Sequence, residues 1–249
     1  MPEKHSNIVQ ILDNIADYLQ YRVDEGSVAA EVNPETVKAL GLDIPTAGKM
    51  KNVTPHRPEQ DPRAELEQLA KVIENCRKCS LGETRTKSVP GQGSFSPEIM
   101  FVGEAPGADE DREGIAFIGR AGQLLTKMIE AMGYAREEVF IGNILKCRPP
   151  DNRTPAPDEM ETCLPYLKQQ ITLLKPKVII ALGATAVKGL LDIKTGITKI
   201  RGTWMLFEGI DLMPTYHPAY LLRNPAAKKE VWKDLKEALK FLGRTPPSK

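Results

Sequence analysis

The sequence predicts an α/β fold in which buried parallel strands alternate with helices. Short apolar runs at residues 99–102, 139–144 and 178–182 are separated by longer segments whose apolar residues recur at helical spacing. Apolar runs without alternation are typical of strands buried on both faces, as in a parallel sheet covered by helices. With 249 residues, the chain is long enough to bury a sizeable core.

The first 61 residues are expected to lie outside this core. From Ser6 to Val23 apolar side chains recur at helical spacing, and Ser6 can cap the N-terminus, so one amphipathic helix is predicted. The segment 25–62 contains five prolines and no periodic pattern, which is typical of a linker. We therefore predict an N-terminal helix and proline-rich linker at 1–61 and the main domain at 62–249.

The main domain is predicted to begin with a helix. Asp61 can cap this helix, and Pro62 suits its first position because proline lacks the amide hydrogen that would be unpaired there. Its apolar face consists of Leu66, Leu69, Ala70 and Ile73. The helix ends close to Cys76, the first of the four cysteines.

Strands and helices then alternate along the chain. The predicted elements are strand 99–102, helix 123–132, strand 139–144, helix 158–174, strand 178–182, helix 184–191, strands 203–207 and 211–214, and helix 227–242. Pro165 falls inside helix 158–174, so we expect this helix to be kinked or split. The last helix should turn Val231, Leu235, Leu239 and Leu242 inward.

Composition excludes some classes of protein. No run approaches the roughly 18 apolar residues that a spanning helix needs, and the polar N-terminus lacks a signal-peptide core, so we expect a cytoplasmic protein without a membrane partner. The 34 Lys and Arg residues nearly balance the 33 Asp and Glu residues. Any contact with nucleic acid must therefore come from a local basic patch.

Three predicted strands run into segments that carry reactive side chains. These segments are 103–111, which is rich in acids, 142–150, which contains Asn143, and 216–223, which contains His217. Because ligands bind at the carboxyl ends of parallel strands, the three segments should converge on one cleft. Taken singly, the acidic turn could be a solvated loop, Asn143 a turn residue and His217 a packed imidazole, but their shared position favours a site.

Four cysteines, Cys76, Cys79, Cys147 and Cys163, favour metal ligation over disulfides in a chain without a secretory signal. The first two form a Cys-x2-Cys pair, and the other two come from distant sequence. Four thiolates suit either tetrahedral zinc or a 4Fe-4S cluster, and the spacing does not separate the two. The remaining alternative is four buried thiols without a metal.

Five sequence blocks resemble the family 4 uracil-DNA glycosylases. They are 103–107 (GEAPG), 116–125 (AFIGRAGQLL), 142–150 (GNILKCRPP), 181–184 (ALGA) and 217–223 (HPAYLLR), in order and with the cysteines in register. The resemblance covers residues 64–243, and the first 60 residues are an addition to it. It implies a central four-stranded parallel sheet flanked by helices, and a structural 4Fe-4S cluster on the four cysteines.

The resemblance also implies the activity, which is hydrolysis of the N-glycosidic bond of uracil in DNA, leaving an abasic site. The base must be extruded from the stack into a pocket. We expect Phe117 to stack on it and Asn143 to read its edge, with backbone contacts from Ala105, Pro106 and Gly107. His217 is expected to donate a hydrogen bond to the leaving uracil.

Carboxylates are expected on the sugar side of the pocket. A carboxylate there can stabilise an oxocarbenium-like transition state and orient water, a role we assign to Glu104. Glu110 and Asp111 are the second candidates. The resemblance places Glu110 near the uracil C5 edge, where it would disfavour the methyl group of thymine.

DNA contacts are expected from two segments. A cluster would tie the loop after Asn143 to the other cysteines, which would bring Lys146 and Arg148 close to the DNA backbone. Leu221 and Leu222 are expected to fill the vacated stack, and Arg223 to bind phosphate.

Two other readings stay open. The fold and cysteines would also suit a non-catalytic nucleic-acid-binding module, although the presence of Glu104, Asn143 and His217 together argues against it. The segment 1–60 is a candidate docking arm for a protein partner, attached to a monomeric repair domain.

Overall fold

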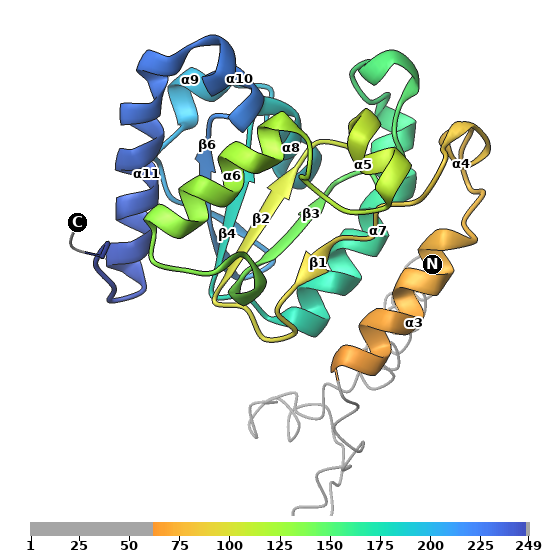
Figure 1. Ribbon diagram of the computed structural model, residues 1–249, viewed down its shortest axis with the longest axis horizontal. Coiled ribbons are helices and arrows are strands. Elements are labelled where there is room, and N and C mark those ends of the chain that lie inside the picture. The colour runs from red at the N-terminus through yellow and green to blue at the C-terminus, as the bar shows by residue number, and fades with distance from the viewer. Residues whose placement is uncertain (1–61, 248–249) are drawn as a thin grey trace, which may run out of the picture. The chain divides into compact units, whose positions relative to one another are not determined.

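A six-stranded mixed sheet forms the centre of the computed structural model, which describes residues 62–247 (Figure 1). Its strand order is β1-β3-β2-β4-β6-β5. The strands are β1 (Gln92–Gly93), β2 (Ile99–Gly103), β3 (Phe140–Asn143), β4 (Val178–Leu182), β5 (Met205–Phe207) and β6 (Ile210–Thr215). The four central strands are parallel, as expected, and the edge strands β1 and β5 are antiparallel to their neighbours. The short strand β1 was not predicted.

The central strands are apolar because both faces of the sheet are covered. In β2, Ile99 and Phe101 belong to the core on one face, whereas Met100 and Val102 belong to the core on the other. All four side chains are fully buried. A strand with two buried faces needs apolar residues at every position, which explains the continuous runs in the sequence.

Helices lie on both faces of the sheet (Figure 1). The helices α6 (Arg120–Ala131) and α11 (Lys228–Phe241) contribute to one core, and α3 (Pro62–Glu74), α7 (Pro157–Leu174) and α8 (Ala184–Leu191) contribute to the other. The shorter helices are α4 (Leu81–Thr84), α5 (Ala108–Glu113), α9 (Ile197–Ile200) and α10 (Pro218–Arg223), with 3-10 turns η1 (Arg136–Glu138), η2 (Pro150–Asn152) and η3 (Pro225–Ala227).

The predicted elements agree with the structure to within about three residues at each end. One expectation is wrong in part, because Pro165 does not split α7, which continues from Pro157 to Leu174. Buried residues on both sides of the proline, Cys163 and Leu167, belong to the same core. Their packing offsets the roughly 3 kcal/mol that an internal proline costs. Leu242, which follows the last residue of α11, is only partly buried, unlike the other three predicted inward residues.

The predicted helix at 6–23, the linker and the Asp61 cap lie outside the described residues, so the domain boundary at 61/62 stays a prediction. None of the helices in residues 62–247 is long and apolar enough to cross a membrane.

A buried ion pair fastens α11 to the end of β6. The Asp234 carboxylate accepts hydrogen bonds from Thr215 Oγ1 at 2.6 Å and from Arg201 Nε at 3.1 Å, and Arg201 Nη2 donates to its other oxygen. Arg201 also donates to the carbonyl of Glu230 at 2.6 Å. Since Thr215 ends β6 two residues before His217, this ion pair also holds the start of a predicted site segment.

Replacing Asp234 by alanine is therefore expected to destabilise the domain by about 3 to 5 kcal/mol, because Arg201 loses its buried counter-charge. Urea unfolding of the variant measures this free energy. Glu237→Ala, at an exposed position of the same helix, is the control and should change stability by less than about 0.5 kcal/mol. Equal losses in both variants would contradict the role given to the ion pair.

Candidate functional site

A pocket of about 520 Å³ lies at the carboxyl ends of the parallel strands. This is the size of a small-molecule site and the position where open parallel sheets bind ligands. The predicted residues that line it are Glu104, Ala105, Pro106, Gly107, Glu110, Phe117, Asn143, His217 and Arg223. The convergence of the three strand ends is thus confirmed. Sequence reasoning missed Ala121, Asn152 and Arg153, whereas Pro149, Ala219 and Tyr220 lie in the predicted segments without having been assigned a role.

Asn143, the last residue of β3, presents an unpaired acceptor in this pocket. Its side chain is buried, and its Oδ1 is the one buried side-chain oxygen or nitrogen in residues 62–247 that has no hydrogen-bond partner. Gly103 pairs with Asn143 across the sheet and leaves it room, since a Cβ there would lie 2.4 Å from Oδ1. A buried acceptor without a partner costs about 1 to 3 kcal/mol, so a ligand that donates a hydrogen bond would recover this energy.

Phe117 forms an aromatic wall of the pocket. Its backbone has a φ of +52°, which is unusual for a residue with a bulky side chain. Gly122 permits this conformation, because a Cβ at that position would lie 1.8 Å from the Phe117 carbonyl oxygen. The Phe117 ring is buried, and its centroid lies 5.6 Å from that of the His217 ring. A flat ligand can therefore contact an aromatic face close to a polar imidazole.

The Glu110 carboxylate links two loops of the pocket. One oxygen accepts hydrogen bonds from the backbone amides of Ile118 at 3.0 Å and Gly119 at 2.9 Å, and the other accepts from Gly107 at 3.1 Å. Both oxygens are therefore engaged with the protein. The neighbouring Asp111 is buried outside the pocket lining and accepts from the Thr86 amide, so its nomination as a catalytic candidate is wrong.

The Glu104 carboxylate is less constrained. Glu104 follows the last residue of β2, its side chain is half-buried, and it lines the pocket. No group in the described part of the chain donates a hydrogen bond to its carboxylate. This carboxylate is therefore available to a ligand or a water molecule.

His217 is held in one orientation by its own backbone. Its Nδ1 accepts a hydrogen bond from the amide of Ala219 at 3.1 Å, so the neutral ring carries its hydrogen on Nε2. Burial, together with the nearby charge of Arg223, lowers the pKa of His217 to about 4. The imidazole is consequently neutral at pH 7 and can donate from Nε2.

Two predicted DNA contacts are contradicted by burial. Lys146 is 1% exposed, and its Nζ donates inward to the carbonyl of Asn143 at 3.0 Å and to Gln170 Oε1 at 2.7 Å. Leu221 is also 1% exposed and belongs to the core beneath α10. Neither side chain can reach DNA without leaving the protein interior.

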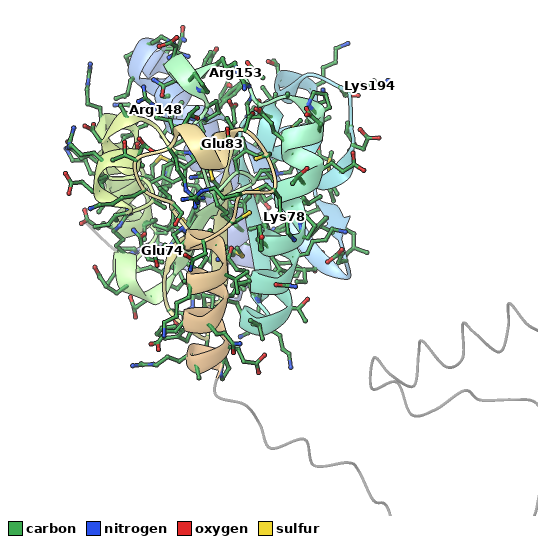
Figure 2. The ribbon with its side chains drawn as sticks, turned by 90° about the vertical axis from the view of Figure 1, so that its right-hand side faces the viewer. Glu74, Lys78, Glu83, Arg148, Arg153 and Lys194 are labelled. Atoms are coloured by element: carbon green, nitrogen blue, oxygen red, sulfur yellow. The ribbon has the colours of Figure 1, made fainter. Side chains whose placement is uncertain are left out.

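The other predicted DNA contacts lie at the surface. Leu222 is 39% exposed, and Arg223 is exposed beside it at the end of α10. Arg148 donates from Nε to Asn152 Oδ1 at 2.8 Å, and Figure 2 shows it on the surface together with Arg153. Arg153 pairs with the buried carboxylate of Glu159 at 2.6 Å.

The four cysteines lie around a second pocket, between the C-terminal end of α3 and α7. They are all free thiols, with Cys147 and Cys163 buried and Cys76 and Cys79 partly exposed. As they stand, no three or more His, Cys, Asp or Glu side chains of the described residues form a group that could hold a metal ion. The thiols therefore surround a space rather than converge on one point.

The sulfur atoms of Cys147 and Cys163 accept hydrogen bonds. Arg85 Nη1 donates to Cys147 Sγ at 2.8 Å, and the amide of Lys146 donates to Cys163 Sγ at 3.3 Å. Arg85 Nη2 also donates to the carbonyl of Cys76 at 3.2 Å. Burial raises the pKa of Cys147, and it raises that of Cys163 to about 11, so a bound metal would have to displace their protons.

Comparison with known proteins identifies relatives over more than half of the chain. The family model described as the Uracil DNA glycosylase superfamily matches residues 90–236. The chain is 48% identical to a type-4 uracil-DNA glycosylase of Pyrobaculum aerophilum over 179 residues, which are 69% of this chain and 91% of that protein. Type-4 uracil-DNA glycosylases of Sulfurisphaera tokodaii and Thermotoga maritima are 47% and 43% identical, over 73% and 71% of this chain and 86% and 94% of their own lengths.

The lowered pKa of His217 predicts a loss of stability in acid. Between pH 6.5 and pH 4 the unfolded chain binds a proton at this residue and the folded protein does not, so stability is full above pH 6.5 and falls as the pH drops to 4. The loss is on the order of 3 kcal/mol. Urea unfolding at pH 7 and pH 4 should show a smaller loss in His217→Gln, whereas parallel losses would contradict the assignment.

Proposed function

The chain belongs to the uracil DNA glycosylase superfamily, with type-4 enzymes among its relatives, and we propose that the pocket at its strand ends is where it excises uracil from DNA. The chain is a DNA-repair hydrolase that breaks the N-glycosidic bond between uracil and deoxyribose. Water adds to the sugar, uracil leaves with the electron pair of the bond and gains a proton, and an abasic site remains. The role of each pocket residue below is our proposal.

Recognition of uracil is assigned to Asn143. Its unpaired Oδ1 would accept from the N3–H of uracil, and its amide group would donate to O4. Cytosine has no hydrogen on N3 and an amine in place of O4, so it would leave the buried amide mismatched. This unpaired acceptor is the observation that carries the assignment of the pocket.

Phe117 would hold the extruded base by stacking. Its buried ring forms one wall of the pocket, and stacking on an aromatic side chain contributes roughly 1 to 3 kcal/mol whatever the base. The backbone of Ala105, Pro106 and Gly107 would contact the base on another side. Stacking therefore supplies affinity, while Asn143 supplies selectivity.

Bond breaking would use His217 and Glu104. A neutral His217 can donate from Nε2 to O2 of uracil as negative charge develops there, and such a donor contributes about 3 kcal/mol. The free carboxylate of Glu104 would stabilise positive charge on the sugar and orient the attacking water.

Glu110 is better suited to holding the pocket than to chemistry. Its two oxygens already accept three backbone hydrogen bonds, so it has less capacity than Glu104 to orient a water. By fixing Gly107 close to Ile118 and Gly119, it would also limit the room beside C5 of the base, where thymine carries a methyl group.

Contact with the DNA strand is assigned to exposed residues near the pocket. Leu222 would fill the space left by the extruded base, and Arg223 would bind phosphate beside it. Arg153 itself lines the pocket, and Arg148 is hydrogen-bonded to Asn152, which also lines it, so both arginines would add positive charge there. The protein would act in the cell interior, where its DNA lies.

The cysteine pocket fits a 4Fe-4S cluster better than a zinc ion. A tetrahedral zinc needs four sulfurs about 2.3 Å from one point, and no such group exists among the described residues. A four-iron cluster takes each thiolate on a different iron atom, so the sulfurs only need to surround a common space. Bound there, the group would tie α3 and α7 to the loop after β3 as a structural support.

Residues 1–61 have no role in this scheme, and we propose that they dock a protein partner. The glycosylase domain itself would act on DNA as a monomer.

Replacing Asn143 by aspartate should lower uracil excision about a hundredfold or more, because a carboxylate cannot donate to O4. The measurement is strand breakage after alkali in an oligonucleotide with one uracil, with a thymine oligonucleotide as the substrate control. Gln169→Glu makes the same chemical change at an exposed position of α7 and should leave excision unchanged. Wild-type activity of Asn143→Asp would refute the pocket assignment.

Replacing Cys147 by serine should remove the metal, because the hydroxyl of serine is a poor ligand for iron. Iron content and visible absorbance of the purified protein are the readouts. Thr162→Ala changes a neighbour of Cys163 in the same pocket and should keep both at wild-type values. Full iron content in Cys147→Ser would overturn the ligand set.

A further inference from the structure

We propose that Lys146 is a positioning residue that joins the uracil pocket to the cysteine centre, fixing Asn143 at one end and balancing thiolate charge at the other. The inference rests on the proposed function, because it concerns the residue assigned to reading uracil. It assigns Lys146 a role inside the protein, in place of the DNA contact that its burial excludes.

The first link runs from Lys146 to Asn143. The ammonium donates to the backbone carbonyl of Asn143 at 3.0 Å and to Gln170 Oε1 at 2.7 Å. Gln170 is a buried residue of α7, and its side-chain amide donates to the carbonyl of Pro90 at 2.8 Å. The carbonyl of Asn143 is thereby fixed by a buried, charge-assisted hydrogen bond, close to the point where its side chain enters the pocket.

The second link runs from Lys146 to the cysteines. Its amide donates to Cys163 Sγ at 3.3 Å, its carbonyl accepts from the Val89 amide at 2.8 Å, and Cys147 follows it in the chain. Lys146 itself lines the cysteine pocket. A shift of either cysteine would therefore be transmitted to the backbone that carries the ammonium group.

The positive charge of Lys146 couples its contact with Asn143 to the charge state of the cysteines. In residues 62–247 no carboxylate forms an ion pair with Lys146, and the two acceptors of its ammonium are neutral oxygens. A buried cation without a counter-charge is costly. Four cysteine thiolates in the adjoining pocket would supply that negative charge, so metal loading would also stabilise the ammonium that holds Asn143.

The test compares the iron-loaded wild-type protein with Lys146→Met. Removing the ammonium should lower the single-turnover rate of uracil excision on the order of tenfold to a hundredfold, through displacement of Asn143. It should also lower the reduction potential of the iron centre, since a cation favours the more negative, reduced state. A residue that only supported folding would reduce the yield of loaded protein and leave both values per loaded molecule unchanged.

A double-mutant cycle shows whether Lys146 acts through Asn143. If it does, Lys146→Met should slow the Asn143→Ala variant little further, because the group that it positions is already missing. Independent, additive losses would overturn the proposal. Lys194→Met is the matched control, because this lysine is exposed and lines neither the uracil pocket nor the cysteine pocket (Figure 2), and it should leave excision unchanged.

Lys146→Gln keeps the proposal testable if Lys146→Met does not fold. An uncharged amide can still donate to the Asn143 carbonyl, so excision should be partly retained, while the reduction potential of the iron centre should fall. A wild-type excision rate together with a wild-type reduction potential would overturn the proposal. If the wild-type protein itself does not excise uracil, the proposed function fails; if it does and the Lys146 variants equal it, only this inference fails.

Discussion

The close approach of β2 and β3 at their carboxyl ends is the constraint on which the site depends. Gly103 and Asn143 are paired there, and only a residue without a side chain leaves room for both the Asn143 amide and the Phe117 ring. The sheet therefore sets the distance between the residue proposed to read the base and the residue proposed to stack on it. Gly122 meets a similar requirement at the start of α6, beneath the carbonyl of Phe117.

Selectivity in such a pocket comes from polar groups whose remaining hydrogen-bonding capacity is left for a ligand. The Asn143 oxygen is left unpaired, and the His217 ring is kept neutral by burial while its Nδ1 is occupied by the backbone. The unpaired oxygen costs stability in the empty protein, whereas the neutral ring costs stability only in acid. Each lowers the free energy only when a ligand with the matching donor or acceptor enters.

The central strands and the convergence of their ends could be predicted from sequence because both follow from simple geometry. Parallel strands share one edge for their carboxyl ends, so Glu104, Asn143 and His217 had to meet. Strand β1 could not be predicted, since its two residues carry no apolar signal. Asn152 and Arg153 were missed as part of the pocket because their position depends on contacts such as that of Arg153 with Glu159. The errors at Lys146 and Leu221 share a cause, because the direction of a side chain in a loop or short helix is set by packing that local sequence does not encode.

The positions of the four cysteines along the chain bear on when the proposed cluster could form. Cys76 and Cys79 precede every central strand, whereas Cys163 lies in α7, after β2 and β3. A cluster bridging all four could be completed only once the ribosome had released the chain beyond Cys163 and α7 had docked against the sheet. Since β4, β6, α8 and α11 follow Cys163 in the chain, such a cluster would join the N-terminal part of the sheet to α7 and would not depend on how the C-terminal part folds.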